Sequence, residues 1–409
     1  MKIAYVTATF PCGHGEGFLD AEIQNVARLV DEILLIPTRP IGKIREHWSS
    51  QADARVRLLS QPLFTSGMLS GFLVFIFLQP LSFFSILSIL ARHSRSVSIF
   101  AKNLLVFPKS VWLAKRLKSE NVRHIHVHWA STSSTMVLIC GVISKIPWSM
   151  TCHRWDIYED NLLAIKSNRA KFVRFISRRG ATDAEKIGAE KTKSVVIPMG
   201  VVIDASPPVR VLQRSIPQIL CAANFIEVKG HKFLIEAIRL LKEVGIPVRL
   251  MLAGTGPLEN ELKGLSMQSG LEDRVEFMGQ LAHDRLLSLY DSNQVDLFVL
   301  PSIEAPGGVH EGIPVSLMEA MARGVPCIST KTGSIEELIP ASLELTVSHS
   351  NSQELADKIK QIIVEPGMYR NASIALGGIV FPHWTADRSA SQIVYKMSDE
   401  SFRVNIASH

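Results

Sequence analysis

Short apolar runs rich in β-branched residues alternate with helix-like stretches along almost the whole chain. In the first half these runs are MKIAYVTATF, DEILLIPT, VRHIHVHWA, PWSMTCH, KFVRFIS and SVVIPMGV. The alternation restarts with PQILCAANF and VRLMLAGTG, after a proline-bearing segment from Asp204 to Pro217 that is typical of a linker. Such alternation is typical of parallel strands joined by crossover helices. It predicts an α/β fold of two domains, residues 1–203 and 204–379, that face one another across a ligand crevice, with residues 380–409 packing back on the first domain.

Composition supports two globular domains and limits the classes of site. The 409 residues are 47% hydrophobic and 20% charged, which is enough apolar material for sizeable cores. The five cysteines are scattered and show no Cys-x-x-Cys spacing, so neither a disulfide framework nor a zinc site is indicated. The first residues favour a β-strand over a signal peptide. We therefore expect a cytoplasmic protein.

Two glutamates flank a Gly-Ile-Pro corner in EGIPVSLMEAMARGVPCIST. The strand-like run VDLFVLPS precedes this segment, and Pro314 with the later Gly324 indicates a helix from about Pro314 to Arg323. Glu311 then lies at the carboxyl edge of a parallel sheet, and Glu319 lies one to two turns inside the helix. Taken alone, the pair is better explained as two solvated acids, since glutamate is mostly exposed in folded chains.

The segment EGIPVSLMEAMARGVPCISTKTGSIEELI resembles the donor-binding signature of the GT4 family of retaining glycosyltransferases, of the exopolysaccharide and lipopolysaccharide type. VKGHKFLIEAI, LAGTGPLENEL and VEFMGQL agree with that family in order and spacing. TFPCGHGEGFLDAEIQNVARL, IHVHWA and TCHRWDIY are similar to its first half. The resemblance covers roughly Lys2 to Glu365. It implies the GT-B architecture, two facing Rossmann-like parallel-sheet domains with a cleft between them.

The resemblance also implies roles for single residues. Glu311 would orient the donor sugar together with the backbone N–H groups that follow it, and Glu319 would hold the ribose hydroxyls. Lys229 would neutralise the leaving diphosphate, and His153 would lie near the donor sugar. The implied catalytic set is His153, Lys229 and Glu311, and the donor-binding set is Gly15, Gly17, Asn224, Gly279, Gln280, Leu281, Gly312, Ile313, Pro314, Val315 and Glu319.

Several of these assignments have alternatives. Asn224 stands where family members often carry an arginine, and an amide cannot neutralise a phosphate. Gly15 and Gly17 lie in the loop PCGHGEG, which is also compatible with a plain flexible turn. His153 fits a structural histidine as well. LAGTGPLE lacks the third glycine of a dinucleotide fingerprint, so a nicotinamide enzyme is not supported.

A metal is not expected, although His124, His126 and His128 alternate along one predicted strand and would share a face. The resemblance implies basic side chains and a helix dipole in place of a cation, and no Asp-x-Asp triplet occurs in the chain. We therefore expect no cofactor and no metal, with a nucleotide diphosphate sugar as co-substrate.

The stretch between Asp53 and Glu120 contains no acidic residue. Within it, Pro62 to Ala91 carries no charge and is dense in leucine, phenylalanine and isoleucine. An interfacial segment on an anionic membrane is favoured over a buried helix pair or a true span, because prolines and glycines interrupt the run. The surplus of basic residues is not accompanied by a nucleic-acid-binding motif. The flanking basic residues are Arg55, Arg57, Arg92, Arg95, Lys102, Lys109, Lys115, Arg116 and Lys118.

We thus expect a retaining glycosyltransferase, peripheral on the inner face of the cytoplasmic membrane, that moves a sugar to a glycan acceptor. A lipid-linked acceptor of exopolysaccharide, capsule or O-antigen assembly fits the apolar segment. The alternatives are a non-hydrolysing nucleotide-sugar epimerase and a non-catalytic protein that binds glycan or membrane.

Overall fold

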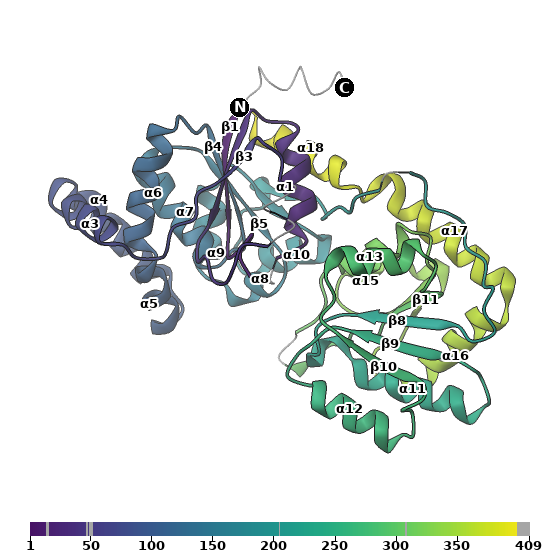
Figure 1. Cartoon of the computed structure of the whole chain (residues 1–409). Helices are drawn as coiled ribbons and strands as arrows, with labels where there is room; N and C mark the ends of the chain where they lie inside the picture. Colours follow the sequence, from purple (N-terminus) through teal and green to yellow (C-terminus); the bar gives the residue numbers. More distant parts are fainter. Residues whose placement is uncertain (14–15, 46–47, 49–51, 204, 307–308, 399–409) are drawn as a thin grey trace. The chain divides into compact units, whose positions relative to one another are not determined.

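The chain, as a computed structural model, is described for residues 1–398 except 14–15, 46–47, 49–51, 204 and 307–308 (Figure 1). It divides into two compact units, each described here by itself. The first unit is Met1–Pro198 with the chain from Asp387 onward, and the second is Met199–Ala386. The sequence placed these boundaries at 203/204 and 379/380. Val201 forms a parallel bridge with Thr385, so the two connecting segments pair with each other, and both belong to the second unit.

The first unit contains a seven-stranded parallel sheet with the strand order β3-β2-β1-β4-β5-β6-β7. All six strand-like runs of the first half contribute a strand, and β3 is an additional three-residue edge strand. The strands are β1 Lys2–Thr7, β2 Glu32–Pro37, β3 Val56–Leu58, β4 His124–His128, β5 Trp148–Cys152, β6 Val173–Phe175 and β7 Ser194–Val196.

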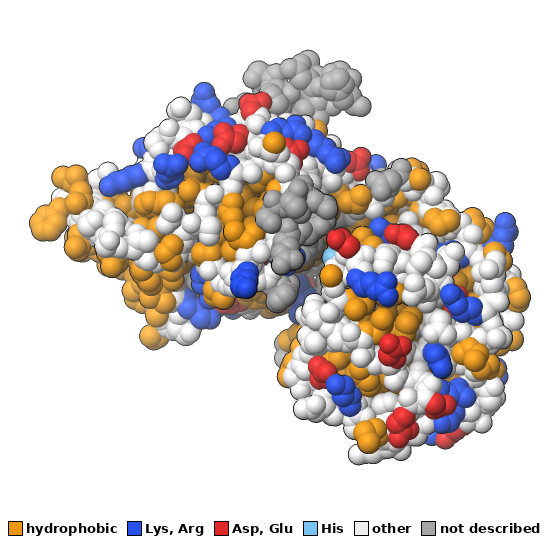
Figure 2. Space-filling view, viewed as in Figure 1, with side chains coloured by type: hydrophobic (Ala, Val, Ile, Leu, Met, Phe, Trp, Pro, Cys, Tyr) orange, Lys and Arg blue, Asp and Glu red, His pale blue; other side chains and the backbone are white. Residues whose placement is uncertain are grey.

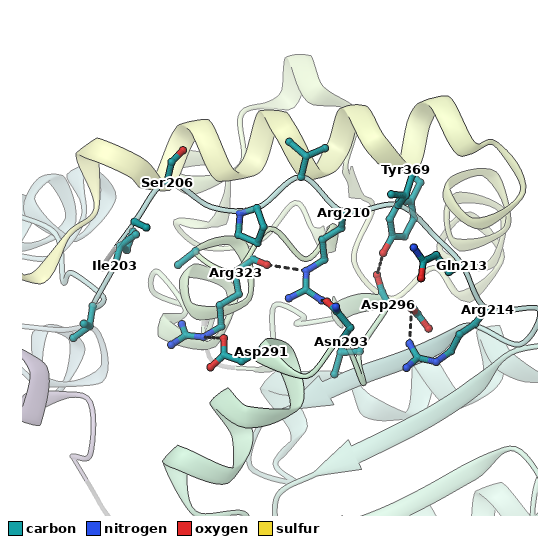
Figure 3. A pocket seen from close by; sticks show the side chains of 17 residues that line it. Ile203, Ser206, Arg210, Gln213, Arg214, Asp291, Asn293, Asp296, Arg323 and Tyr369 are labelled. Carbon is teal, nitrogen blue, oxygen red and sulfur yellow. Dashed lines mark hydrogen bonds and ion pairs between the residues drawn. The ribbon is translucent and has the colours of Figure 1, made fainter.

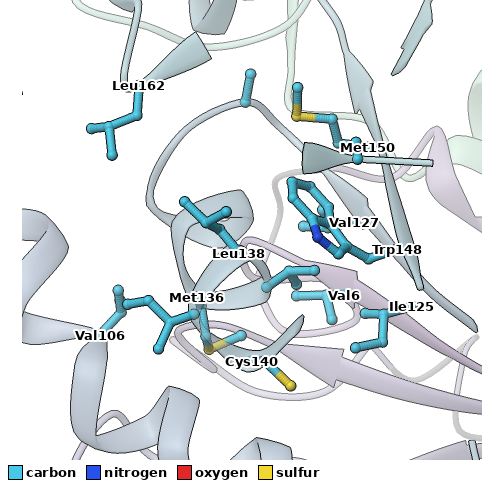
Figure 4. Packing of buried hydrophobic residues seen from close by; sticks show 14 of the residues in the cluster. Val6, Val106, Ile125, Val127, Met136, Leu138, Cys140, Trp148, Met150 and Leu162 are labelled. Atoms are coloured by element: carbon cyan, nitrogen blue, oxygen red, sulfur yellow. The ribbon is translucent and has the colours of Figure 1, made fainter. Parts of the chain in front are cut away.

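Helices cover both faces of this sheet. Helices α6 and α7 pack on one face over a core that includes Val6, Val127 and Met150 (Figure 4). Helices α1 and α18 lie over the other face, where the polar side chains of β1, β4 and β6 point. The helices of this unit are α1 Leu19–Ala27, α3 Ser66–Leu78, α4 Pro80–His93, α5 Val97–Leu105, α6 Phe107–Ser119, α7 Thr132–Ser144, α8 Trp155–Glu159, α9 Leu163–Arg169, α10 Arg178–Lys186 and α18 Ala386–Met397.

The second unit contains a six-stranded parallel sheet with the order β10-β9-β8-β11-β12-β13. Its strands are β8 Gln218–Ala222, β9 Arg249–Ala253, β10 Val275–Gly279, β11 Leu297–Leu300, β12 Cys327–Thr330 and β13 Thr346–Val347. Its helices are α11 His231–Glu243, α12 Glu259–Gln268, α13 His283–Asp291, α14 Val315–Met321, α15 Ile335–Leu338, α16 Ser352–Val364 and α17 Pro366–His383.

The predicted linker after residue 204 is a packed part of the second unit. Arg210 is buried, and its guanidinium donates to the carbonyls of Tyr290 and Arg323 at 2.6 and 2.8 Å (Figure 3). A Cβ on Gly324 would lie 1.9 Å from the Pro208 carbonyl oxygen, so this glycine allows the close approach. The prolines therefore shape a segment that is fixed by hydrogen bonds.

Candidate active site

Lys229 and Glu311 form an ion pair in the second unit. The Lys229 Nζ lies 2.6 Å from Glu311 Oε2, and the Ser302 hydroxyl donates to the same oxygen at 3.1 Å. Glu311 is buried, and Ser302 follows β11 at the carboxyl edge of the sheet. The pair therefore puts a cation and an anion side by side at the edge where parallel sheets of this kind bind ligands.

Two glycines hold this arrangement by close backbone approach. Gly230, at φ +65°, follows the 3₁₀ turn Glu227–Lys229, and a Cβ there would lie 2.0 Å from the Pro301 carbonyl oxygen. Gly333, at φ +56°, leaves no room for a Cβ against the Glu311 carbonyl. Both positions need a residue without a side chain in a left-handed conformation. The turn bearing Lys229 and the loop bearing Glu311 are thus fixed against the strand ends.

Glu319 is 9% exposed and accepts a hydrogen bond from His283, whose Nε2 lies 2.7 Å from Glu319 Oε1. The hydrogen bond to this carboxylate raises the pKa of His283. Helix α14 begins at Val315, with Pro314 as the residue before it, and ends at Met321, two residues short of the predicted Arg323. Gly312, Ile313 and Pro314 therefore lead into the helix and Val315 begins it, so all four residues lie between the two glutamates.

The remaining predicted donor-binding residues of this unit lie on neighbouring loops. Asn224 is exposed, two residues after the end of β8. Gly279, at φ +67°, ends β10, and the Gly254 N–H donates to its carbonyl at 2.8 Å. Gln280 accepts a hydrogen bond from the Thr255 hydroxyl at 3.1 Å, and Leu281 is half-buried. The structure brings these loops to the same sheet edge as Lys229, since each follows a parallel strand.

His153 lies in the first unit, directly after β5. Its ring packs against Trp129 with centroids 4.2 Å apart, and its Nε2 lies 2.9 Å from His128 Nδ1. Burial, followed by the neighbouring His128 and Arg174, holds the pKa of His153 well below its ordinary value. The imidazole is therefore neutral at physiological pH.

The glycine loop that precedes α1 is only partly described. Gly15 lies outside the described residues. A Cβ on Gly17 would lie 2.6 Å from an Arg45 guanidinium nitrogen, so Gly17 makes room for that side chain. Contact of Gly17 with a donor or acceptor stays a prediction.

Among the described residues, one group has the spacing of metal ligands, Glu22 with His126 and His128. Their ligand atoms lie within 4.8 Å of one another. Hydrogen bonds account for this group without a metal: Arg174 contacts Glu22, and the two nitrogens of His126 lie 2.8 and 2.9 Å from the hydroxyls of Ser149 and Thr151. The expectation that no metal is used stays a prediction.

A cavity of about 680 Å³ in the second unit lies elsewhere (Figure 3). It runs beneath the segment that contains Arg210 and Arg214, and Asp291, Asn293 and Asp296 lie along it. None of the predicted site residues lines it. Its charged groups are already paired, as Arg214 with Asp296 at 2.8 Å, so we assign the chemistry to the Lys229 and Glu311 edge instead.

Sequence reasoning missed several side chains that complete the two groups. Ser302 directly follows an apolar strand run, and a polar residue at this position could have been predicted as part of the site. His283 had no such signal, because its contact with Glu319 joins two helices that are separate in the chain. Glu22 and Arg174 look like ordinary surface charges in the sequence, yet both are buried.

Residues 205–375 match the family model described as glycosyl transferases group 1. This segment of the chain, less than half of its length, is therefore similar to that family. The match confirms the resemblance to GT4 glycosyltransferases that the sequence motifs indicated. One relative is WcaL of Escherichia coli K12, whose name as a colanic acid biosynthesis glycosyltransferase is provisional, with 37% identity over 45% of each chain. Another is the amylovoran biosynthesis glycosyltransferase AmsK of Erwinia amylovora, with 41% identity over 30% of each chain. The chain thus spans less than half the length of the curated relatives it matches.

Solved structures show the same fold over nearly the whole chain. HepE of Anabaena, in complex with UDP and glucose, has a TM-score of 0.70 at 17% identity and covers 97% of this chain and 99% of its own. Sucrose-phosphate synthase of Thermosynechococcus elongatus has a TM-score of 0.71 at 16% identity and covers 100% of both chains. The predicted fold class, GT-B with two parallel-sheet α/β domains, is confirmed. The cleft between the domains stays a prediction.

Proposed function

We propose that the protein is a retaining glycosyltransferase that moves a sugar from a nucleotide diphosphate sugar to a glycan acceptor in exopolysaccharide assembly. The observation that carries the proposal is the Lys229 and Glu311 ion pair, 2.6 Å long, at the carboxyl edge of the sheet. The group 1 family match and the printed names of the relatives support the same reaction class.

In the proposed reaction, the bond between the sugar anomeric carbon and the diphosphate breaks, and a bond to an acceptor hydroxyl forms on the same face. The acceptor proton passes to an oxygen of the departing phosphate, so no enzyme nucleophile is required. Negative charge grows on the diphosphate as the bond breaks. Lys229 would stabilise that charge, because a cation on a preorganised turn needs no rearrangement at that moment.

The two glutamates would divide the donor between them. Glu311, fixed by Lys229 and Ser302, would accept hydrogen bonds from the sugar hydroxyls, and Glu319 would accept them from the ribose. The backbone of Gly279 to Leu281 would contact the base. This division predicts that the nucleoside part and the sugar part of the donor depend on different carboxylates.

Turnover with a membrane lipid extract tests the function against its alternatives. The full-length protein is incubated with nucleotide diphosphate sugars, and labelled sugar in the lipid fraction and free nucleoside diphosphate are measured. A transferase yields both, with the anomeric configuration of the donor. An epimerase yields an epimerised nucleotide sugar without acceptor, and a binding protein yields no product. Either of the last two results would overturn the proposal.

Replacing Glu319 by alanine should weaken nucleoside diphosphate binding roughly 10-fold to 100-fold, the loss expected for charge-assisted hydrogen bonds to the ribose. Calorimetric titration with a panel of nucleoside diphosphates measures the effect. Glu272→Ala is the matched control, because Glu272 is an exposed acid in the same unit that lies outside the donor-binding signature. Equal affinities of the Glu319→Ala variant and the wild type would remove Glu319 from the donor site.

We also propose that the acceptor is lipid-linked, because the first unit presents a large apolar surface on α3, α4 and α5. Hydrophobic side chains gather over these helices in Figure 2. The exposed fractions are 85% for Phe77 and 87% for Leu81, at the bend of 107° between α3 and α4. Phe107 anchors the opposite side of this helix pair, with the Phe72 ring centroid 5.0 Å away. An apolar corner of this kind fits insertion into the outer part of a lipid bilayer.

The charges beside this corner are fewer than the sequence indicated. Lys109 is fully buried, and its ammonium donates to the carbonyls of Pro37, Thr38 and Gln61 at 2.7 to 2.9 Å. Burial lowers the pKa of Lys109 to about 8. Arg95 is paired with Asp160 at 2.5 Å and Lys102 with Glu159 at 3.7 Å. Membrane attraction would therefore rest mainly on the apolar side chains, with Arg92 and the paired cations in support.

Within the described residues, one helix has the length and composition to cross a membrane. It is Val97–Ser119, which combines α5 and α6 when they are counted as one continuous helix. Half of its apolar window is buried inside the protein, as in the core helix of a soluble protein. The α3 and α4 pair would count only as a broken span. Peripheral contact at the cytoplasmic face is accordingly the form of membrane association that we propose.

The double variant Phe77→Asp with Leu81→Asp should lower binding to anionic vesicles at least about 100-fold, since burying each side chain is worth roughly 1.5–3 kcal/mol. Vesicle flotation measures binding, and Met267→Asp, at an exposed apolar position of α12, is the matched control. High salt should release only part of the wild type. Absence of wild-type binding at low salt would mean that the acceptor is soluble.

A further inference from the structure

Four buried polar side chains of the first unit form a continuous hydrogen-bonded chain that ends at His153. Arg174 Nη1 donates to Glu22 Oε2 at 2.6 Å, and Glu22 Oε1 lies 2.9 Å from His128 Nε2. His128 Nδ1 then lies 2.9 Å from His153 Nε2. All four residues are buried. The chain therefore links a buried ion pair to the proposed active-site histidine without an intervening gap.

The fold brings these residues together on one face of the sheet. Glu22 lies in α1, His128 ends β4, Arg174 lies in the middle of β6, and His153 follows β5. His124 and His126 share the face but take no part in the hydrogen-bonded chain. His124 Nε2 and both ring nitrogens of His126 contact the hydroxyls of Ser149 and Thr151 instead. Among the three alternating histidines, His128 is thus the one that connects to His153.

The two formal charges of this hydrogen-bonded chain are those of Arg174 and Glu22. They are opposite, so the four side chains together carry no net charge when both imidazoles are neutral. An additional charge at a site with so little solvent would be costly. Burial alone would raise the pKa of Glu22, yet Arg174 and His128 hold it well below its ordinary value, so the carboxylate is ionised.

The hydrogen-bond partners then assign each proton. A neutral imidazole has one N–H and one acceptor nitrogen, and the partners determine which is which. The ionised Glu22 only accepts, and the Tyr5 hydroxyl, 3.1 Å from His128 Nε2, already gives its own proton to Glu22. His128 therefore carries its proton on Nε2, where it can donate to both oxygens. His128 Nδ1 is then an acceptor, and His153 Nε2 must supply the proton between the two rings. His153 Nδ1 is left with its lone pair.

We propose that Glu22, acting through His128, fixes His153 as the Nε2–H tautomer, so that Nδ1 accepts a hydrogen bond from a hydroxyl of the sugar substrate. Glu22 and His128 are positioning residues in this scheme. The sugar contact rests on the function proposed above, whereas the proton positions do not. Two contacts hold the His153 ring in place. The Trp129 ring packs against it, and the Asp156 carboxylate accepts a hydrogen bond from the His153 backbone N–H at 3.0 Å.

The tautomer can be measured directly in the full chain labelled with ¹⁵N histidine. Long-range ¹H–¹⁵N spectra separate protonated from unprotonated ring nitrogens. The chain has 13 histidines, so the His153 signals are identified by their loss in His153→Gln. We expect Nε2 protonated and Nδ1 unprotonated between pH 6 and 8. A wild-type His153 that is doubly protonated, or protonated at Nδ1, would overturn the proposal whether or not any variant folds.

The isosteric variant Glu22→Gln should invert the tautomer. Arg174 can only donate, so the new amide should turn its oxygen to Arg174 and its NH₂ to His128. His128 then moves its proton to Nδ1, and His153 Nε2 becomes the acceptor. His124→Gln is the matched control. His124 is equally buried and lies on the same strand as His128, but it is not a member of the hydrogen-bonded series from Arg174 to His153. An unchanged His153 tautomer in folded Glu22→Gln would contradict the proposal.

Kinetics supply a second and independent readout. Glu22→Gln should lower kcat roughly 10-fold to 100-fold, the range typical of outer hydrogen-bond partners of an active site. Nucleoside diphosphate affinity should stay unchanged, since Glu319 and the base-contacting loop belong to the other unit. If the wild type transfers no sugar, the proposed function fails while the tautomer result stands. If the wild type is active and Glu22→Gln keeps full kcat with an inverted tautomer, His153 is not a sugar acceptor and the contact is overturned.

Discussion

Replacing Lys229 by alanine should lower the rate of sugar transfer roughly 10²-fold to 10³-fold, the loss typical of removing one preorganised group that stabilises developing negative charge. The effect should appear in kcat, because the charge on the diphosphate is largest as the glycosidic bond breaks. Turnover is measured with labelled donor and lipid extract. Lys232→Ala is the matched control, because Lys232 is an exposed lysine three residues further along the chain.

The same variant leaves Glu311 without its counter-ion, so folding has to be checked by thermal unfolding before the kinetics are interpreted. Lys229→Arg keeps the charge and should recover part of the rate. Near-normal turnover of a folded Lys229→Ala enzyme would contradict the leaving-group role. Asn224→Arg is a further test of that role, because a cation at this exposed position should preserve or raise donor affinity if the diphosphate lies beside Lys229.

The sequence predicted most of the fold because the period of its apolar residues is a local property. Each long strand of both sheets corresponds to an apolar run. The sequence also predicts helices that start at about His231, Pro257 and Asp284, and α11, α12 and α13 begin within two residues of these positions. The edge strands β3 and β13 were missed because, unlike the similarly short β6 and β7, they do not lie inside a longer apolar run. The apolar pattern therefore predicts a strand where the run around it is long enough to be recognised.

Side-chain environments were harder to predict, because they depend on partners far away in the chain. Lys109 lies in a basic stretch and was taken as a surface cation, yet the carbonyls at the end of β2 enclose its ammonium. Glu22 lies in an amphipathic helix, and its partner Arg174 is 152 residues away. A buried charge and an exposed charge look alike until the partner is known.

The ion pair of Arg174 with Glu22 should also carry a large share of the stability of the first unit. Arg174→Met should lower its free energy of unfolding by about 3–5 kcal/mol, because it leaves a buried carboxylate without its cation. Three further acceptors lose a donor at the same time, the carbonyls of Ile197 and Pro198 and the Ser389 hydroxyl of α18. Tryptophan fluorescence during urea unfolding reports mainly on this unit, since five of the six tryptophans belong to it.

The pH dependence of this loss has a definite sign. The folded-state pKa of Glu22 is depressed, so its stabilising contribution is present above the unfolded pKa of about 4.3 and is lost as pH falls through the folded value. In Arg174→Met the carboxyl should instead take up a proton more readily than in the unfolded chain. The difference in stability between wild type and variant should therefore be largest near pH 7 and shrink toward pH 4.

Arg57→Met is the matched control for the buried pair. Arg57 makes two ion pairs in the same unit, with Glu32 at 3.0 Å and Glu120 at 2.7 Å, but its side chain is 43% exposed. Solvent screens such pairs, so the control should lose no more than about 1 kcal/mol. The double variant Arg174→Met with Glu22→Gln removes the unpaired charge and should regain part of the loss. Equal, small effects of Arg174→Met and Arg57→Met would show that the buried pair contributes no more than a surface one, and that Glu22 does not depend on Arg174 for its charge.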